Sequence, residues 1–206
     1  GTKSWNSVTD PAIKLAENGF PLSPALAKAL GNLKADWQKY PSSGKVFLHS
    51  DGSPFKTGEI WKQPDLAGAL RRFQQNGRAG FYSGEVAHAI AADMRAHGGL
   101  ITEADLAAYE ARERKPIHGV YRGFDIYSMP PPSSGGVALV EMLNILEPYD
   151  LKSLGHNSAP YLHLLVETMR RAFADRAKYL GDPDFNSDIP IALLTSKERA
   201  DKLRKT

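Results

Sequence analysis

Three consecutive prolines in the middle of the chain separate a strand-like segment from an apolar helical segment. Residues 121–129 alternate aromatic or aliphatic side chains with polar ones, a period typical of a short strand. Pro130–Pro132 can continue neither a strand ladder nor a helix, because each proline lacks an N–H and has a fixed φ. The apolar residues 137–147 then predict a buried helix. The sequence therefore predicts a strand, a rigid turn and a helix within about one βα unit.

The junction between the prolines and this helix is Ser133-Ser134-Gly135-Gly136. We favour a helix N-cap by one of the two serines, together with close packing at Gly135. An anion bound by the free N–H groups of the helix start is a second interpretation. A serine nucleophile on a Gly-x-Ser-x-Gly elbow is the weakest interpretation, because Pro132 stands where the preceding glycine would be.

The rest of the chain reads as mostly helical, with a minor strand fraction. Apolar residues at helical spacing predict two helices between residues 7 and 40, and further helices over 64–75, 83–97, 160–180 and 196–203. Thr102 begins another helix with a capping-box pattern. Short strands are predicted at 46–49, with 60–62 as partner, and at 117–121 paired with 124–127. No linker or repeat interrupts the chain, so we expect one domain over residues 1–206.

Composition restricts the class of protein. The chain has 42% hydrophobic and 24% charged residues, which is typical of a globular protein, and no apolar run approaches the ~18 residues that span a bilayer. The net charge of +3 is mild and the basic residues form no stripe, which argues against nucleic-acid binding. The absence of cysteine excludes disulfides and thiolate chemistry. The first residues show no signal-peptide pattern.

Other polar clusters have structural interpretations. The six histidines show no His-x-x-x-His spacing, so no metal site is predicted. Asp182-Pro183-Asp184 could offer two carboxylates to a cation, but Asp beside Pro more often stabilises a turn. Asp175 can reach Arg171 and Tyr179 along its helix and would help to lock that helix to its neighbours. No residue of the chain is assigned a catalytic, substrate-binding or metal-binding role.

Two runs of sequence together resemble the large subunit of γ-glutamyltransferases, also called γ-glutamyl transpeptidases. The first is Tyr121–Leu146, with its Pro-Pro-Pro-Ser-Ser-Gly-Gly turn, and the second is Ala174–Phe185, which contains Tyr-Leu-Gly-Asp-Pro. Further matches keep the family order; they are Pro11-Ala12-Ile13, Gly19-Phe20, Gln63–Ala67, Gly80–Gly84, Gly98–Thr102 and Asp105–Tyr109. The resemblance covers nearly the whole chain, and six ordered segments make it specific.

The resemblance implies an N-terminal-nucleophile hydrolase, of which this chain is a predominantly helical α+β segment of the αββα sandwich. Such a precursor cuts itself and exposes a threonine at the start of a small subunit. That threonine attacks a γ-glutamyl amide such as glutathione, with its own α-amine as base, and forms a γ-glutamyl-enzyme. An oxyanion hole stabilises the tetrahedral intermediate. Water, an amino acid or a peptide then takes the glutamyl group, and no cofactor is needed.

Parts of the family pattern have no match in this chain. The nucleophile motif, Thr-Thr-His followed by Ser-Val, is missing, and Thr206 has no following residue and is not assigned that role. The family's early Arg-Glu region, which holds the substrate α-carboxylate, is missing too. We therefore expect a fragment of the large subunit, inactive alone, whose partner is the small subunit, in the periplasm or outside the cell. The alternatives are a structural or interaction piece, or a cephalosporin acylase or capsule depolymerase of the same fold.

Overall fold

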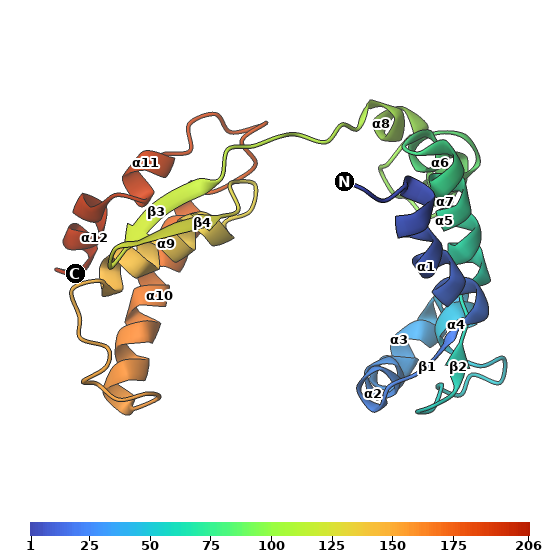
Figure 1. Cartoon of the computed structure of the whole chain (residues 1–206), viewed down its shortest axis with the longest axis horizontal. Helices are drawn as coiled ribbons and strands as arrows, with labels where there is room; N and C mark the ends of the chain where they lie inside the picture. The colour runs from blue at the N-terminus through green and yellow to red at the C-terminus, as the bar shows by residue number, and fades with distance from the viewer. The chain divides into compact units, whose positions relative to one another are not determined.

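A computed structural model describes residues 1–206; helices dominate it, and each of its two sheets has only two strands (Figure 1). The chain forms two units, Gly1–Ala111 and Arg112–Thr206. The expectation of one domain over residues 1–206 stays a prediction. No helix of the chain has both the length and the apolar character needed to cross a membrane.

The first unit contains eight helices and one two-stranded sheet. In chain order its elements are α1 (Trp5–Asn18), β1 (Phe20–Pro21), α2 (Pro24–Asn32), α3 (Lys34–Lys39), α4 (Pro41–Phe47), β2 (Ile60–Trp61), α5 (Pro64–Asn76), α6 (Ala79–Tyr82), α7 (Gly84–Ala96) and α8 (Glu103–Ala108). Ser4 and Ser23 cap α1 and α2 by accepting a backbone N–H with their hydroxyl groups. The capping box predicted at Thr102 is confirmed, because the Asp105 carboxylate accepts a hydrogen bond from the Thr102 N–H while the Thr102 hydroxyl accepts one from the Asp105 N–H.

The core of the first unit lies where α2 meets the small sheet. Leu22, Leu30 and Trp61 are buried against one another with Ala27. β1 pairs with β2 in antiparallel register, Phe20 opposite Trp61. The Phe20 and Trp61 rings meet edge to face at 5.9 Å, a favourable aromatic geometry. The strand at residues 60–62 therefore exists, but its partner is β1.

The strand predicted at residues 46–49 is wrong for Val46 and Phe47, which belong to α4, whereas Leu48 makes a single antiparallel bridge to Pro54. Pro41 is the first residue of this helix. Proline is accepted there because an N–H at the first helical position would have no partner within the helix. Phe47 stacks on Trp37 with ring centroids 4.4 Å apart, and the Val46 carbonyl accepts a hydrogen bond of 2.9 Å from the Trp61 indole. Tertiary packing thus overrides the strand preference of two β-forming residues.

The second unit packs a hairpin and three helices around a central helix. Its elements are β3 (Ile117–Tyr121), β4 (Phe124–Ser128), α9 (Gly135–Leu146), α10 (Ala159–Tyr179), α11 (Ile191–Leu194) and α12 (Lys197–Leu203). The predicted hairpin is confirmed, with Ile117 opposite Ser128 and Tyr121 opposite Phe124. Its two turn residues, Arg122 and Gly123, both have positive φ, as a tight two-residue hairpin turn requires.

Helix α9 is the centre of the second unit. Val137 and Val140 are buried with Ile117 of β3 and Leu194 of α11. Helices α10 and α12 also pack on α9, so the helix is covered on most sides. This explains why its sequence is apolar around almost its whole circumference.

Close packing at the start of α9 falls on Gly136, so the expectation that it would fall on Gly135 is wrong. A Cβ on Gly136 would lie 3.1 Å from Ser128 Cβ and closer still to the Met129 carbonyl oxygen. A Cβ on Gly135 would meet only Ser133 Oγ, at 3.5 Å. The difference arises because Gly136 is on the side of α9 that faces the end of β4, whereas Gly135 is exposed.

Candidate functional site

The two serines before α9 bond to different partners. The Ser133 hydroxyl accepts a hydrogen bond of 3.3 Å from the Gly135 N–H, which is a local bond within the turn before α9. The Ser134 hydroxyl accepts a hydrogen bond of 2.8 Å from Arg176 Nε on α10. The predicted serine N-cap is therefore wrong: Ser134 is at the N-cap position but its side chain makes no cap hydrogen bond, and it joins the turn to α10 instead. Neither hydroxyl bonds to a histidine or carboxylate, so the geometry provides no base that would activate a serine nucleophile.

A hollow of about 390 Å³ opens beside this turn. Ser134 and Arg176 line it together with Pro132 and Asp182. The Arg176 guanidinium and the start of α9 favour a negative group, whereas the Asp182 carboxylate opposes one. Arg176 also lies over the Phe173 ring, 5.8 Å from its centroid, which helps to fix its position. The hollow contains hydrogen-bond donors but no pair of nucleophile and base.

The Asp182-Pro183-Asp184 segment forms a turn. Asp182 Oδ1 accepts the Asp184 N–H at 3.0 Å, which is the short-range bond expected of aspartate in a turn. Arg114 donates to Asp184 at 2.8 Å and so attaches the turn to the segment before β3. No group of three or more His, Asp or Glu side chains is arranged to hold a metal ion.

The second unit contains a charged cluster of two buried carboxylates, Glu141 on α9 and Asp175 on α10, with the half-buried Arg199 of α12. Asp175 is only 6% exposed and accepts two hydrogen bonds from Arg199, 2.9 Å from Nε and 2.7 Å from Nη2. Glu141 is 1% exposed, and its Oε1 has no hydrogen-bond partner. Burial, and next the neighbouring Asp175, raise the pKa of Glu141 to about 8, while Arg199 opposes the shift.

The sequence interpretation located this cluster only in part. It expected Asp175 to bond Arg171 or Tyr179, but Arg171 pairs with Glu167 at 2.6 Å and Asp175 pairs with Arg199. The prediction that Asp175 locks its helix to its neighbours is therefore right in kind, with a different partner. Glu141 was missed, although a single carboxylate inside the apolar run 137–146 is a signal of a buried charged group.

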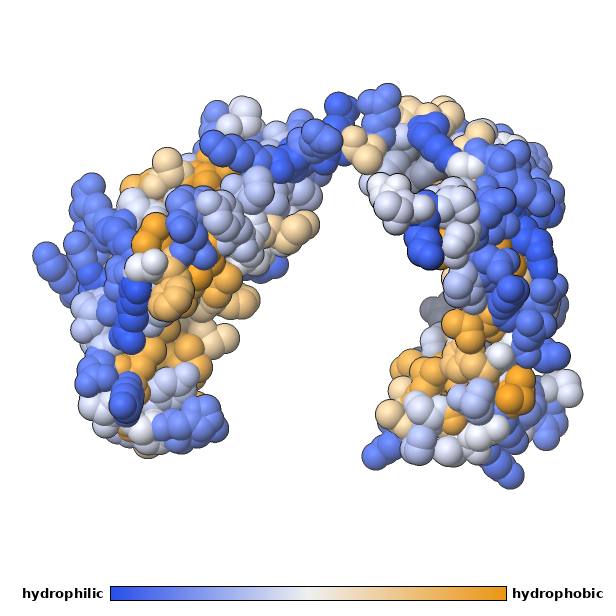
Figure 2. All heavy atoms as spheres, viewed as in Figure 1, coloured by the Kyte–Doolittle hydropathy of each residue, from blue (hydrophilic) through white to orange (hydrophobic).

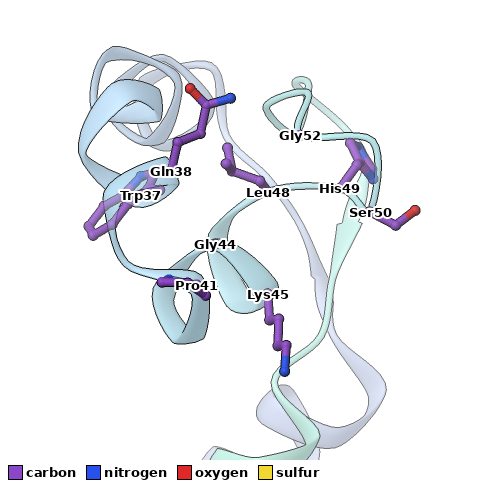
Figure 3. Close-up of a pocket in the computed structure, with 9 residues that line it drawn as sticks. All are labelled: Trp37, Gln38, Pro41, Gly44, Lys45, Leu48, His49, Ser50 and Gly52. Atoms are coloured by element: carbon purple, nitrogen blue, oxygen red, sulfur yellow. The ribbon is translucent and has the colours of Figure 1, made fainter.

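A second hollow, of about 400 Å³, lies in the first unit between α3, α4 and the turn that follows α4 (Figure 3). Trp37, Leu48 and His49 line it, but the Lys45 ammonium and the Ser50 hydroxyl point in different directions. His49 bonds to Glu59 at 2.9 Å, and Glu59 also accepts the Lys56 N–H, which stabilises the loop. Because the polar groups do not converge, this hollow lacks the arrangement typical of a ligand site.

Apolar residues gather on parts of the surface of each unit (Figure 2). In the second unit four of them follow one face of α10 at spacings of four and three residues, and we call them the α10 stripe: Leu162, Val166, Met169 and Phe173. Between 40% and 57% of each residue is exposed. An exposed stripe of this length on a helix typically marks a surface that another element or chain covers.

Comparison with solved structures establishes the fold class of this chain. The fold matches a crystal structure of Helicobacter pylori gamma-glutamyltranspeptidase over 100% of this chain, with a TM-score of 0.94 and 43% sequence identity. The chain covers 58% of that structure. The predicted fold class is thereby confirmed: the chain is a helix-rich α+β segment of an N-terminal-nucleophile hydrolase.

The family follows from the sequence comparisons. The gamma-glutamyltranspeptidase family model matches residues 1–206, and the chain belongs to this family. It is 45% identical over 200 residues to the glutathione hydrolase proenzyme of Escherichia coli strain K12, a match that covers 97% of this chain and 34% of that protein. It is 42% identical to the acylase ACY 1 proenzyme of Pseudomonas sp. strain SE83, over 99% of this chain and 36% of that protein. The chain thus spans about a third of the length of these relatives.

Proposed function

We propose that the protein containing this chain is a γ-glutamyltransferase that cleaves γ-glutamyl amides such as glutathione. An N-terminal threonine outside these 206 residues attacks the γ-carbonyl, and the amide nitrogen leaves with a proton. Water or an amino group then takes the glutamyl group from the enzyme. The observation that carries the proposal is the match of the family model to all 206 residues.

In this proposal the chain is part of the large subunit and contributes scaffold, without a reacting group. The absence of an activating base beside Ser133 and Ser134 supports that role. The partner is the small subunit cut from the same precursor, and the α10 stripe offers it an apolar surface. The names of the relatives as proenzymes support a precursor that is processed. We place the mature enzyme in the periplasm or outside the cell.

A second candidate keeps the mechanism and changes the acyl group. The relative named as an acylase is 42% identical to this chain, close to the 45% of the relative named as a glutathione hydrolase. Neither of the two hollows described above has an arrangement of side chains that would select one acyl group over another. The selecting residues of this proposal lie on the other parts of the precursor.

The test is a substrate comparison with the full-length, processed protein. We expect release of p-nitroaniline from γ-glutamyl-p-nitroanilide, and a γ-glutamyl adduct on the N-terminal threonine by mass spectrometry. Ser133→Ala and Ser134→Ala are matched controls that should retain turnover. Turnover of an acyl-cephalosporin without turnover of the γ-glutamyl substrate would favour the acylase. If the processed protein turned over neither substrate, both enzymatic proposals would be wrong and a structural role would be favoured.

A further inference from the structure

The cluster of Glu141, Asp175 and Arg199 joins the three helices α9, α10 and α12. Its two carboxyl groups face one guanidinium group, and that group is already engaged by Asp175 through two hydrogen bonds. Glu141 is 1% exposed, its Oε1 has no hydrogen-bond partner, and Asp175 is the neighbouring carboxylate that helps to raise its pKa. Two ionised carboxylates beside one positive charge would leave a net negative charge inside the unit, which is strongly unfavourable.

We propose that Glu141 carries a proton beside the ion pair of Asp175 and Arg199, so that raising the pH through neutrality removes this proton and weakens the hold of α12 on α9 and α10. The proton makes the Glu141 carboxyl group neutral, and the cluster is then electrically balanced. Without the proton, the carboxylates repel each other across the contact that Arg199 makes. This is a pH-sensitive contact within the scaffold and goes beyond the proposed reaction.

The surroundings of Glu141 contain few other charges. The charged groups next to Glu141 are Asp175 of α10 and Arg199 of α12. Tyr179 of α10 is a further titratable group beside Arg199. β3, β4 and α11 contribute apolar side chains to the neighbouring core, namely Ile117, Ile126, Ile191 and Leu194. The Glu141 carboxyl group therefore has one charged neighbour of each sign.

Other contacts of the C-terminal segment do not depend on this proton. Arg204 donates to the Asn144 carbonyl at 2.9 Å, and Arg171 donates to the Leu203 carbonyl at 2.9 Å. Asn144 donates to the Thr195 carbonyl at 2.8 Å, just before α12. These bonds keep the segment attached when the cluster loses its proton, so the expected change is more frequent opening of α12 and not unfolding of the unit.

The direction of the pH effect follows from the raised pKa of Glu141. The closed state retains its proton up to a pKa of about 8, while a solvated glutamate has the ordinary value of 4.5. The stabilising contribution is therefore complete below pH 4.5, decreases as pH rises, and is lost above about pH 8. One proton changes the closing equilibrium by at most about tenfold per pH unit in this window.

Amide hydrogen exchange of the full-length protein tests the proposal. Exchange rates of peptides from α12 are divided by those of an unstructured reference peptide at pH 5.5 and pH 7.5. We expect the wild-type protection of α12 to fall about tenfold or more between these pH values, with less than threefold change in Glu141→Gln. Helix α7 of the other unit serves as an internal control and should change equally in both proteins.

A second variant keeps the test decisive if Glu141→Gln folds poorly. In Asp175→Asn the only carboxylate left can pair with Arg199, so the fall in protection should shrink to less than threefold. Wild-type protection that is the same at both pH values overturns the proposal. So does an equal fall in the wild type and in whichever variant folds, because the proton would then reside elsewhere.

Discussion

The two glycines that begin α9 offer a direct test of the packing at this turn. In Gly136→Ala the new Cβ meets the Met129 carbonyl oxygen at less than 3.0 Å and Ser128 Cβ at 3.1 Å. The Met129 oxygen belongs to the backbone, so it can move only if the segment after β4 moves. Forcing one extra methyl group into a packed site costs about 1–3 kcal/mol, and a backbone neighbour places this site near the upper end.

Helix propensity partly offsets this loss of stability, so it must be subtracted to obtain the net change in the free energy of unfolding. Alanine is favoured over glycine in a helix by about 1 kcal/mol. For Gly136→Ala the net loss is therefore about 2 kcal/mol. Gly135→Ala is the matched control, because its Cβ meets only Ser133 Oγ at an ordinary 3.5 Å and its φ is not positive. That variant should be neutral or slightly more stable than wild type.

Thermal unfolding followed by far-ultraviolet circular dichroism measures the difference. In a chain of this length about 2 kcal/mol corresponds to a decrease of about 4–8 °C in melting temperature. The measurement is made on dilute protein, so that association does not shift the transition. A Gly136→Ala variant as stable as the wild type, or a Gly135→Ala variant that loses more, would refute the assignment of the close approach to Gly136.

Three further predictions concern the second unit. Arg199→Met should destabilise this unit by about 3 kcal/mol in urea unfolding, because the buried Asp175 carboxylate loses its partner. Lys202→Met is the control: it breaks only an exposed ion pair and should leave the urea midpoint unchanged. Ser158→Ala should cost about 1 kcal/mol by removing the N-cap of α10, measured as a lower urea midpoint with the same slope, and a change near zero would contradict the cap. The isolated 206-residue chain should self-associate through the α10 stripe in light scattering, and Val166→Lys with Phe173→Lys should restore a monomer; a wild-type chain that stays monomeric at high concentration would count against this surface.

Elements set by neighbouring residues could be read from the sequence. The capping box at Thr102, the hairpin 117–128 and the long helix ending near Tyr179 were all predicted and are all present. The family assignment rested on ordered motifs and is confirmed by the match over residues 1–206. These features depend on spacing and turn chemistry over a few residues, which a sequence contains directly.

Helix α4 is an element that local sequence patterns did not predict. Residues 46–49 contain β-forming side chains, yet the start at Pro41 and the stacking of Phe47 on Trp37 place residues 41–47 in a helix. A short apolar run is compatible with either state, and the energy of its packing decides between them.

Tertiary structure alone decided which polar groups meet. Ser134 bonds to Arg176, 42 residues away, and Asp175 bonds to Arg199, 24 residues away. Gly136, and not Gly135, meets the backbone at the end of β4. The sequence determined most of the helices, the hairpin and the family, because local geometry and ordered motifs depend on consecutive residues. The partner of each buried charge, and with it the proton on Glu141, was fixed only when α9, α10 and α12 came together and excluded water.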